Sequence, residues 1–231
     1  MRRMTSRRTR IKICGITRVE DAIAAARAGA DAIGVVFWPG TPRFVSHAQA
    51  QAIVGALPAF VTVVGLFVDP DPDAVRAALS AVPLDLLQFH GSESGEFCRS
   101  FGRRYLKAIP VKEGVDLLEC TRPYGDAAGL LFDTHLEGDL PGGTGRVFDW
   151  RRLSEGVRAR LGSRLILSGG LDAGNVERAI REIDPWAVDV SSGVEERDPD
   201  GKPRRGLKDA ARIAAFVQGV RSADGRAGTR A

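Results

Sequence analysis

The chain alternates eight times between short apolar runs rich in β-forming residues and longer stretches with helical spacing. The apolar runs lie at residues 11–16, 32–37, 61–67, 84–90, 105–111, 129–134, 165–168 and 187–191. The helical stretches lie at residues 19–28, 48–57, 73–81, 96–102, 115–120, 150–160, 175–183 and 207–220. Most apolar runs are continuous, which is typical of parallel strands covered on both faces. The pattern predicts an α/β protein with a single-domain (β/α)8 TIM barrel, with a doubly wound open sheet as the alternative.

Charge separates the two ends of the chain from its body. Residues 1–10 hold five arginines and no acid, and residues 221–231 hold three arginines and one acid. The remaining body has 25 basic and 28 acidic residues, so the formal charge of +4 comes from the ends. We predict a disordered basic tail at 1–10, the barrel at 11–220 and a flexible tail at 221–231. A nucleic-acid arm or a short targeting segment is the alternative for the first tail.

The cysteines and the hydropathy pattern limit the compartment and the cofactors. Cys14, Cys98 and Cys120 are far apart, odd in number and without CxxC spacing, so they favour neither a disulfide framework nor a zinc site. No apolar stretch reaches the ~18 to 20 residues that span a bilayer, and the N-terminus lacks a signal-peptide core. We predict a cytoplasmic protein without metal or cofactor that binds neither membrane nor nucleic acid.

Reactive side chains gather where the predicted strands give way to loops. In a (β/α)8 barrel the site forms at these C-terminal strand ends. The residues found there are Cys14, Arg43, His90, Asp133, Ser168, Gly169, Gly170, Ser191, Ser192 and Gly193. A thiol and a carboxylate in such positions have the properties of a base and an acid. Glycine-rich turns suit a phosphate, because backbone N–H groups can approach an anion closely there.

Seven segments, in order along nearly the whole body, resemble one enzyme family. They are KICGITR (12–18), GVVFWPGTPRFVS (34–46), LQFHG (87–91), LLFDT (130–134), GGTGRVFDW (142–150), LSGGL (167–171) and VDVSSGVE (188–195). Together they resemble the phosphoribosylanthranilate isomerases of tryptophan biosynthesis. Thr41 stands where that family usually has serine, and it keeps the hydroxyl.

The resemblance implies an intramolecular aldose–ketose isomerase. Its reaction is the Amadori rearrangement of N-(5-phosphoribosyl)anthranilate to 1-(2-carboxyphenylamino)-1-deoxy-D-ribulose 5-phosphate, which needs one acid and one base. The matched motifs imply Asp133 as the acid and Cys14 as the base. Asp133 can hold a proton near neutral pH only if burial or a nearby anion disfavours its ionisation. Lys12 lies on the same strand face as Cys14, and its ammonium would stabilise the thiolate.

The other candidates are substrate contacts. The turns at 168–170 and 191–193 are predicted to bind phosphate, since loops after strands seven and eight commonly do so. Arg43 is predicted to grip the anthranilate carboxylate. The segment Gly142, Gly143, Thr144 and Gly145 is either a lid over the substrate, which we favour, or a turn. His90 is either a substrate contact or a structural residue, and Asp189 either orients sugar hydroxyls or faces the core.

Two other functions remain as alternatives. A related barrel isomerase of the histidine pathway would be expected to use two aspartates, whereas the first strand here ends in Cys14. A phosphate-ligand-binding barrel, or a nucleic-acid protein that uses the basic arm, would not need Cys14 or Asp133. The expected partner is a small phosphorylated sugar–anthranilate, and the chain is expected to be a monomer or a homodimer.

Overall fold

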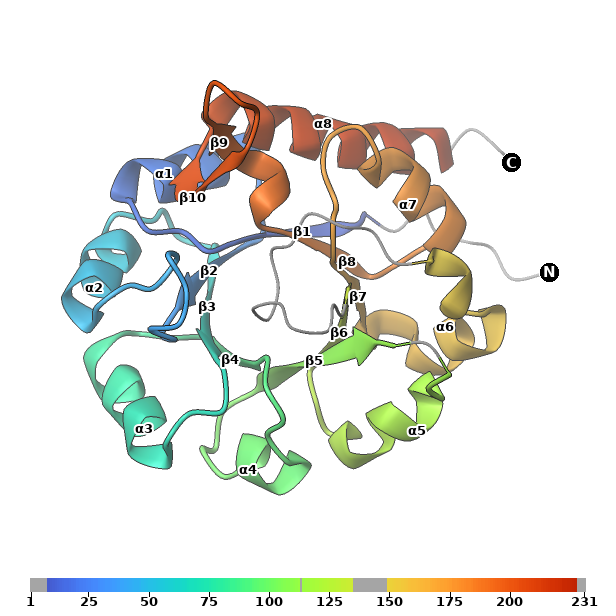
Figure 1. Ribbon diagram of the computed structural model, residues 1–231, viewed down its shortest axis with the longest axis horizontal. Coiled ribbons are helices and arrows are strands. Elements are labelled where there is room, and N and C mark those ends of the chain that lie inside the picture. Colours follow the sequence, from blue (N-terminus) through green and yellow to red (C-terminus); the bar gives the residue numbers. More distant parts are fainter. Residues whose placement is uncertain (1–7, 113, 135–148, 228–231) are drawn as a thin grey trace.

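The structure, a computed structural model, describes residues 8–112, 114–134 and 149–227. Within these residues, eight parallel strands form a closed barrel in sequential order, with helices around it (Figure 1). The strands are β1 (Arg10–Cys14), β2 (Ala32–Val36), β3 (Thr62–Phe67), β4 (Leu86–Phe89), β5 (Tyr105–Val111), β6 (Gly129–Thr134), β7 (Leu165–Leu167) and β8 (Ala187–Val190). Pairing of β1 with β8 closes the ring. The predicted fold class is confirmed.

Helices follow the strands and cover the outside of the barrel (Figure 1). They are α1 (Val19–Ala28), α2 (His47–Gly55), α3 (Pro72–Ala81), α4 (Gly95–Arg99), α5 (Leu117–Thr121), α6 (Glu155–Leu161), α7 (Val176–Ile183) and α8 (Ala210–Ala227), with short 3-10 turns η1 (Arg122–Tyr124), η2 (Trp150–Arg152), η3 (Gly162–Arg164) and η4 (Ser192–Val194). In the described part of the chain, none of these helices is long and apolar enough to cross a membrane.

The barrel wall buries apolar side chains on both faces, because side chains alternate along each strand. Outward side chains such as Ile33 and Phe67 pack with the helices in one continuous core. Inward side chains fill the lower barrel in a second cluster, Val64, Leu106, Ala108, Leu131, Ile166 and Ala187. Nearer the C-terminal strand ends, Cys14 packs with Val36 and Leu66. Apolar side chains therefore fill the barrel interior below the C-terminal strand ends, where the site is expected.

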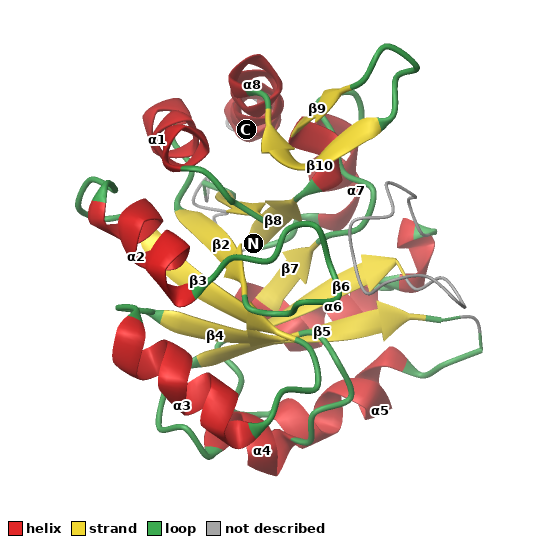
Figure 2. Cartoon of the chain, turned by 60° about the vertical axis from the view of Figure 1, so that its left-hand side comes forward, coloured by secondary structure: helices red, strands yellow, loops and turns green. Residues whose placement is uncertain are grey.

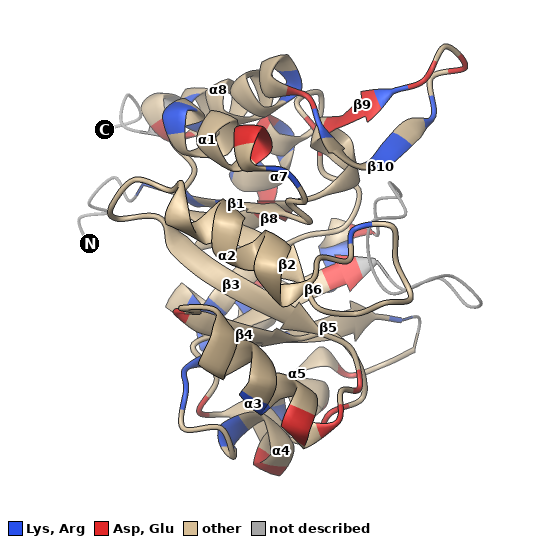
Figure 3. Ribbon diagram, turned by 90° about the vertical axis from the view of Figure 1, so that its left-hand side faces the viewer, with Lys and Arg blue, Asp and Glu red and all other residues tan. Residues whose placement is uncertain are grey.

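Charged residues are rare in the barrel wall, and most of the buried ones lie at the site. Strands β2, β3 and β4 contain none, and Figure 3 shows the charges concentrated on helices and loops. The buried charges on the described barrel strands are Lys12, Lys107, Asp133 and Asp189. Lys107 binds Glu93 at 3.1 Å and lies over the Tyr124 ring, outside the barrel. The other three lie at the C-terminal end of the barrel interior and line or underlie its pocket.

The boundaries near the two ends of the chain differ from the prediction. A hairpin of β9 (Glu195–Arg197) and β10 (Pro203–Lys208) follows β8 and lies beside α8 (Figure 2). Residues 207 and 208, expected in the last helix, therefore belong to β10, and α8 begins at Ala210. The helix continues to Ala227, so the expected start of a flexible tail at 221 falls inside α8. At the other end, Arg10 already belongs to β1, while residues 1–7 lie outside the described residues.

Asp224 in α8 ties the start of the chain to this extended helix. Its carboxylate accepts the Thr9 N–H at 2.9 Å and the Thr9 hydroxyl at 2.7 Å. Replacing Asp224 with alanine removes both bonds and is expected to lower the free energy of unfolding by about 2 kcal/mol. Chemical denaturation measures this loss. Asp200→Ala, a change at an exposed turn residue, is the control and should stay within about 0.5 kcal/mol of the unchanged protein. Equal stability of the two variants would contradict a stabilising role of the Thr9–Asp224 hydrogen bonds.

Candidate active site

A pocket opens at the C-terminal end of the barrel, where side chains from most of the strands converge. Seven of the predicted site residues line it: Cys14, Arg43, His90, Asp133, Ser168, Asp189 and Ser191. Five others adjoin these residues in the fold: Lys12, Gly169, Gly170, Ser192 and Gly193. The remaining four, Gly142, Gly143, Thr144 and Gly145, lie outside the described residues. Apolar side chains complete the wall, namely Val36, Trp38, Leu66 and Val68.

Cys14, the last residue of β1, is 5% exposed and has cations as neighbours. Its thiol interacts with the ammonium of Lys12, whose Nζ lies 2.8 Å from Oδ1 of Asp189. Burial raises the pKa of the Cys14 thiol, and the charges of Lys12 and Lys208 offset only part of that rise. Lys12 and Cys14 thus share a face, as expected. The net effect on the thiol is the reverse of the expected one, because burial outweighs the ammonium.

Asp133 lies on β6 and faces the same pocket as Cys14. Its Oδ2 is 3.2 Å from Nε2 of His90, and Nδ1 of His90 is 3.2 Å from Nε2 of Gln88. With Gln88 as donor to Nδ1, the proton of a neutral His90 lies on Nε2 and is donated to Asp133. His90, which the sequence left undecided, therefore lies in the pocket wall in contact with the candidate acid.

Arg43 lines the pocket, but part of its guanidinium is already bound. Its Nε and Nη2 donate to the two carboxylate oxygens of Glu195 at 2.7 and 2.9 Å. This edge of the guanidinium is therefore not available to the carboxylate that Arg43 is predicted to grip. The stem of Arg43 lies across Gly15, where a Cβ would be 2.6 Å from the Arg43 Cδ and φ is +74°. Glycine is needed at this position for both reasons.

The two glycine-rich turns after β7 and β8 lie side by side. Gly169 and Gly170 both have positive φ, 81° and 66°, a region that favours glycine. A Cβ at Gly193 would lie 2.0 Å from the Leu171 carbonyl oxygen, so the second turn packs directly against the first. Asp189, between the turns and Lys12, accepts a hydrogen bond from Ser168 Oγ at 3.3 Å. Asp189 therefore connects Lys12, which lies beside Cys14, to Ser168 in the predicted phosphate-binding turn.

Sequence reasoning missed three polar residues of this region. Gln88 lines the pocket two residues before His90, on the same strand face, so the alternation of a strand could have indicated it. Glu195 stood in a quoted motif without a role. Lys208 donates to the backbone and hydroxyl oxygens of Ser191 at 3.0 and 3.4 Å. It gave no signal, because its segment was expected to be helical.

Among the described residues, no group of three or more His, Cys, Asp or Glu side chains is arranged to hold a metal ion.

The comparisons with known proteins agree with one another. The family model for N-(5'phosphoribosyl)anthranilate (PRA) isomerase matches residues 11–219. An N-(5'-phosphoribosyl)anthranilate isomerase from Nitrosospira multiformis is 53% identical over 211 residues, covering 91% of this chain and 96% of that protein. Another from Pseudomonas aeruginosa is 54% identical over 213 residues, covering 92% and 95%.

Solved structures give the same result. The phosphoribosyl anthranilate isomerase from Thermotoga maritima matches with a TM-score of 0.82 and 38% identity, covering 93% of this chain and 99% of that one. A phosphoribosyl anthranilate isomerase in complex with reduced 1-(o-carboxyphenylamino)-1-deoxyribulose 5-phosphate matches with a TM-score of 0.78 and 36% identity, over the same shares. Since the family model spans nearly the whole barrel and relatives are more than half identical over almost their full length, this chain belongs to the phosphoribosylanthranilate isomerase family.

Proposed function

We propose that this chain converts N-(5-phosphoribosyl)anthranilate to 1-(2-carboxyphenylamino)-1-deoxy-D-ribulose 5-phosphate in tryptophan biosynthesis. The observation that carries the proposal is that the two family-motif residues Cys14 and Asp133 line one pocket. They come from β1 and β6, far apart in the sequence. An acid and a base that face one cavity are what this isomerisation requires.

The reaction moves two protons in sequence. In the first step the acid protonates the ring oxygen while the C1–O bond breaks, and the nitrogen lone pair forms a C1=N bond. In the second step the base removes the proton from C2, those electrons form a C1=C2 double bond, and the electron pair of the C1=N bond returns to nitrogen. The resulting enolamine tautomerises to the aminoketose. We assign the first transfer to Asp133 and the second to Cys14.

His90 lies beside the proposed acid. Its Nε2 is 3.2 Å from Oδ2 of Asp133, a contact that holds the carboxyl group in place within the pocket. Asp133 is also buried in the pocket wall. The phosphate and carboxylate of a bound substrate would bring negative charge to the same pocket, and nearby negative charge favours a protonated carboxyl group.

The base must be a thiolate, and the free protein disfavours that form by burial. The nearby ammonium groups of Lys12 and Lys208 are the counter-ions that a thiolate would have. Cys14 is therefore a base that ionises only in a small fraction of molecules near neutral pH. Lys12 and Lys208 stabilise its charged form, while burial and the Asp189 carboxylate oppose it.

The two ends of the substrate suit different walls of the pocket. The paired turns at 168–170 and 191–193 offer backbone N–H groups and serine hydroxyls to the phosphate. The apolar side chains Trp38, Leu66 and Val68 offer a surface for the aromatic ring. Arg43 lies at the same wall and would bind the ring carboxylate. The oligomeric state stays a prediction; the relative from Thermotoga maritima is dimeric.

The direct test of this function is a fluorescence assay with freshly generated N-(5-phosphoribosyl)anthranilate. Addition of the protein should speed the loss of substrate fluorescence well above the spontaneous rate, and mass spectrometry with periodate cleavage should identify the aminoketose as product. A correctly folded protein that leaves the spontaneous rate unchanged would contradict the proposal and direct attention to other phosphorylated sugars.

Replacing Arg43 with alanine should mainly weaken substrate binding. Loss of charge-assisted hydrogen bonds to a carboxylate is expected to raise KM roughly tenfold to a hundredfold, with little change in kcat. Steady-state kinetics measures both constants. Arg76→Ala, at an exposed arginine of α3, is the control and should leave both unchanged. A fall in kcat alone would place Arg43 in the chemical step instead.

A further inference from the structure

Glu195, the first residue of β9, lies between two cations at the edge of the pocket and is 0% exposed. Its Oε1 accepts from Arg43 Nε at 2.7 Å, and its Oε2 accepts from Arg43 Nη2 at 2.9 Å. Oε1 also accepts from the Lys208 ammonium at 3.2 Å and from the Gly206 N–H at 2.9 Å. Both oxygens are thus bound in fixed directions.

One carboxylate here faces two positive groups. Burial alone would raise the pKa of Glu195, but the charges of Lys208 and Arg43 lower it to about 2. Glu195 is therefore ionised at any pH at which the protein is folded and working. One positive charge remains in excess beside the pocket, which suits an anionic ligand group.

Because the guanidinium is planar, its pairing with Glu195 fixes the direction in which the rest of the group points. Among the described residues, the Arg43 guanidinium bonds to Glu195 through Nε and one N–H of Nη2. Of its five N–H donors, three remain, and two of them, one on Nη1 and one on Nη2, form the opposite edge. Because the group is rigid and planar, holding one edge by two hydrogen bonds fixes the direction of the other edge.

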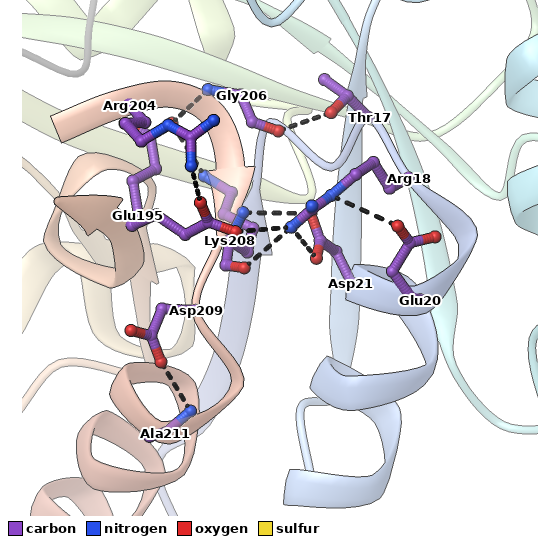
Figure 4. A network of polar contacts seen from close by, with 11 residues as sticks. Thr17, Arg18, Glu20, Asp21, Glu195, Arg204, Gly206, Lys208, Asp209 and Ala211 are labelled. Carbon is purple, nitrogen blue, oxygen red and sulfur yellow. Dashed lines mark hydrogen bonds and ion pairs between the residues drawn. The ribbon is translucent and has the colours of Figure 1, made fainter. Parts of the chain in front are cut away.

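The hairpin that supplies Glu195 is itself anchored to the loop after Cys14 (Figure 4). Gly206 accepts a hydrogen bond from the Thr17 hydroxyl through its carbonyl oxygen. The Lys208 backbone donates to Asp21 at 3.0 Å and accepts from Arg18 at 3.0 Å. These contacts join β10 to the loop before α1 and to the first turn of that helix. The position of Glu195 is thereby fixed relative to Cys14.

From this geometry we propose that Glu195 is a positioning residue that aims the open edge of Arg43 at the carboxylate of the substrate. The β9–β10 hairpin, which belongs to none of the eight strand–helix units, would thereby set the preference for an aromatic amine that bears a carboxylate. The inference rests on the proposed function, in which Arg43 binds that carboxylate.

The test compares two substrates, N-(5-phosphoribosyl)anthranilate and the corresponding aniline derivative, which lacks only the carboxylate. In Glu195→Gln the amide keeps the shape but loses the charge and one acceptor. KM for the anthranilate substrate should rise about tenfold while kcat changes less than threefold. The constants for the aniline derivative should not change. The variant should therefore lose about a tenfold preference for the carboxylate.

Two further variants separate positioning from general loosening of the fold. Glu195→Asp keeps the charge but retracts the carboxylate by one methylene, so it should fold and still lose the preference for the anthranilate substrate. It replaces Glu195→Gln as the test variant if the latter does not fold. Asp224→Asn weakens the fold at the far end of the barrel and should leave the substrate preference unchanged. In the Arg43→Ala background, Glu195→Gln should add little to KM, since its proposed effect on the substrate carboxylate acts through that arginine.

Several results would overturn the inference. Unchanged selectivity in a folded Glu195 variant would do so, as would equal losses for both substrates or additive effects of the Arg43 and Glu195 changes. A similar loss of substrate preference in Asp224→Asn would show that the loss comes from general loosening of the fold and not from Glu195. If the unchanged protein turned over neither substrate, the proposed function itself would fail, and the inference with it. If the unchanged protein is active and the Glu195 variants keep its substrate preference, the inference about Glu195 fails while the proposed function stands.

Discussion

Replacing Cys14 with serine is expected to lower kcat roughly 10²- to 10⁴-fold while leaving the fold and substrate binding intact. Serine is close to cysteine in size, so the contacts with Val36 and Leu66 survive. Its hydroxyl ionises far less readily than a thiol and cannot take the C2 proton at a useful rate. Steady-state kinetics, with binding of a product analogue measured separately, checks both parts of the expectation.

The pH dependence gives this variant a second readout. Because burial raises the pKa of the Cys14 thiol, the thiolate is a minor form at neutral pH. Its fraction, and with it kcat/KM of the unchanged protein, should therefore increase as pH rises through the neutral range. That increase should be absent in Cys14→Ser. The control is Cys120→Ser, at a half-buried cysteine of α5 away from the pocket, which should keep both the rate and the pH dependence. Near-normal turnover in Cys14→Ser would overturn the assignment.

Replacing Asp133 with asparagine is the second large effect. The amide is nearly the same size as the carboxyl group and can still accept from His90 Nε2, so the pocket should keep its shape. It has no acidic proton to give to the ring oxygen, and kcat should fall roughly 10²- to 10⁴-fold.

The measurement is the same fluorescence assay, supported by circular dichroism to establish folding. Asp126→Asn changes a partly exposed aspartate paired with Arg99 on the outside of the barrel and should not affect the rate. If Asp133→Asn retained turnover while Cys14→Ser lost it, the acid would have to be another group, and His90 would be the next to replace.

Most of the barrel could be predicted because its strands carry local signals. Continuous apolar runs gave β5 and β6 with their observed bounds, and helical spacing did the same for α1. Position at a strand end then led to six residues that line the pocket. Local pattern was less reliable at helix starts. The third helical stretch was expected to begin at residue 73, whereas Asp71 caps α3 and Pro72 occupies the first helical position.

The contacts that organise the pocket could not be predicted, because they join distant parts of the chain. Arg43 and Glu195 are 152 residues apart, and nothing in either segment indicates that one binds the other. The β9–β10 hairpin is short and polar, so it lacks the apolar run that marks a barrel strand. For Cys14 the neighbouring lysine was visible in the sequence, but the degree of burial that outweighs it depends on the closed barrel.

The measurement that tests the central claim most directly compares binding and turnover in the same three proteins. The unchanged protein, Cys14→Ser and Asp133→Asn would each be titrated with reduced 1-(o-carboxyphenylamino)-1-deoxyribulose 5-phosphate and assayed with N-(5-phosphoribosyl)anthranilate. We predict that the three dissociation constants agree within about threefold, while both variants lose at least about a hundredfold in kcat. Turnover close to normal in either variant, or binding lost in parallel with turnover, would contradict the claim that Cys14 and Asp133 act as the proton-transfer pair.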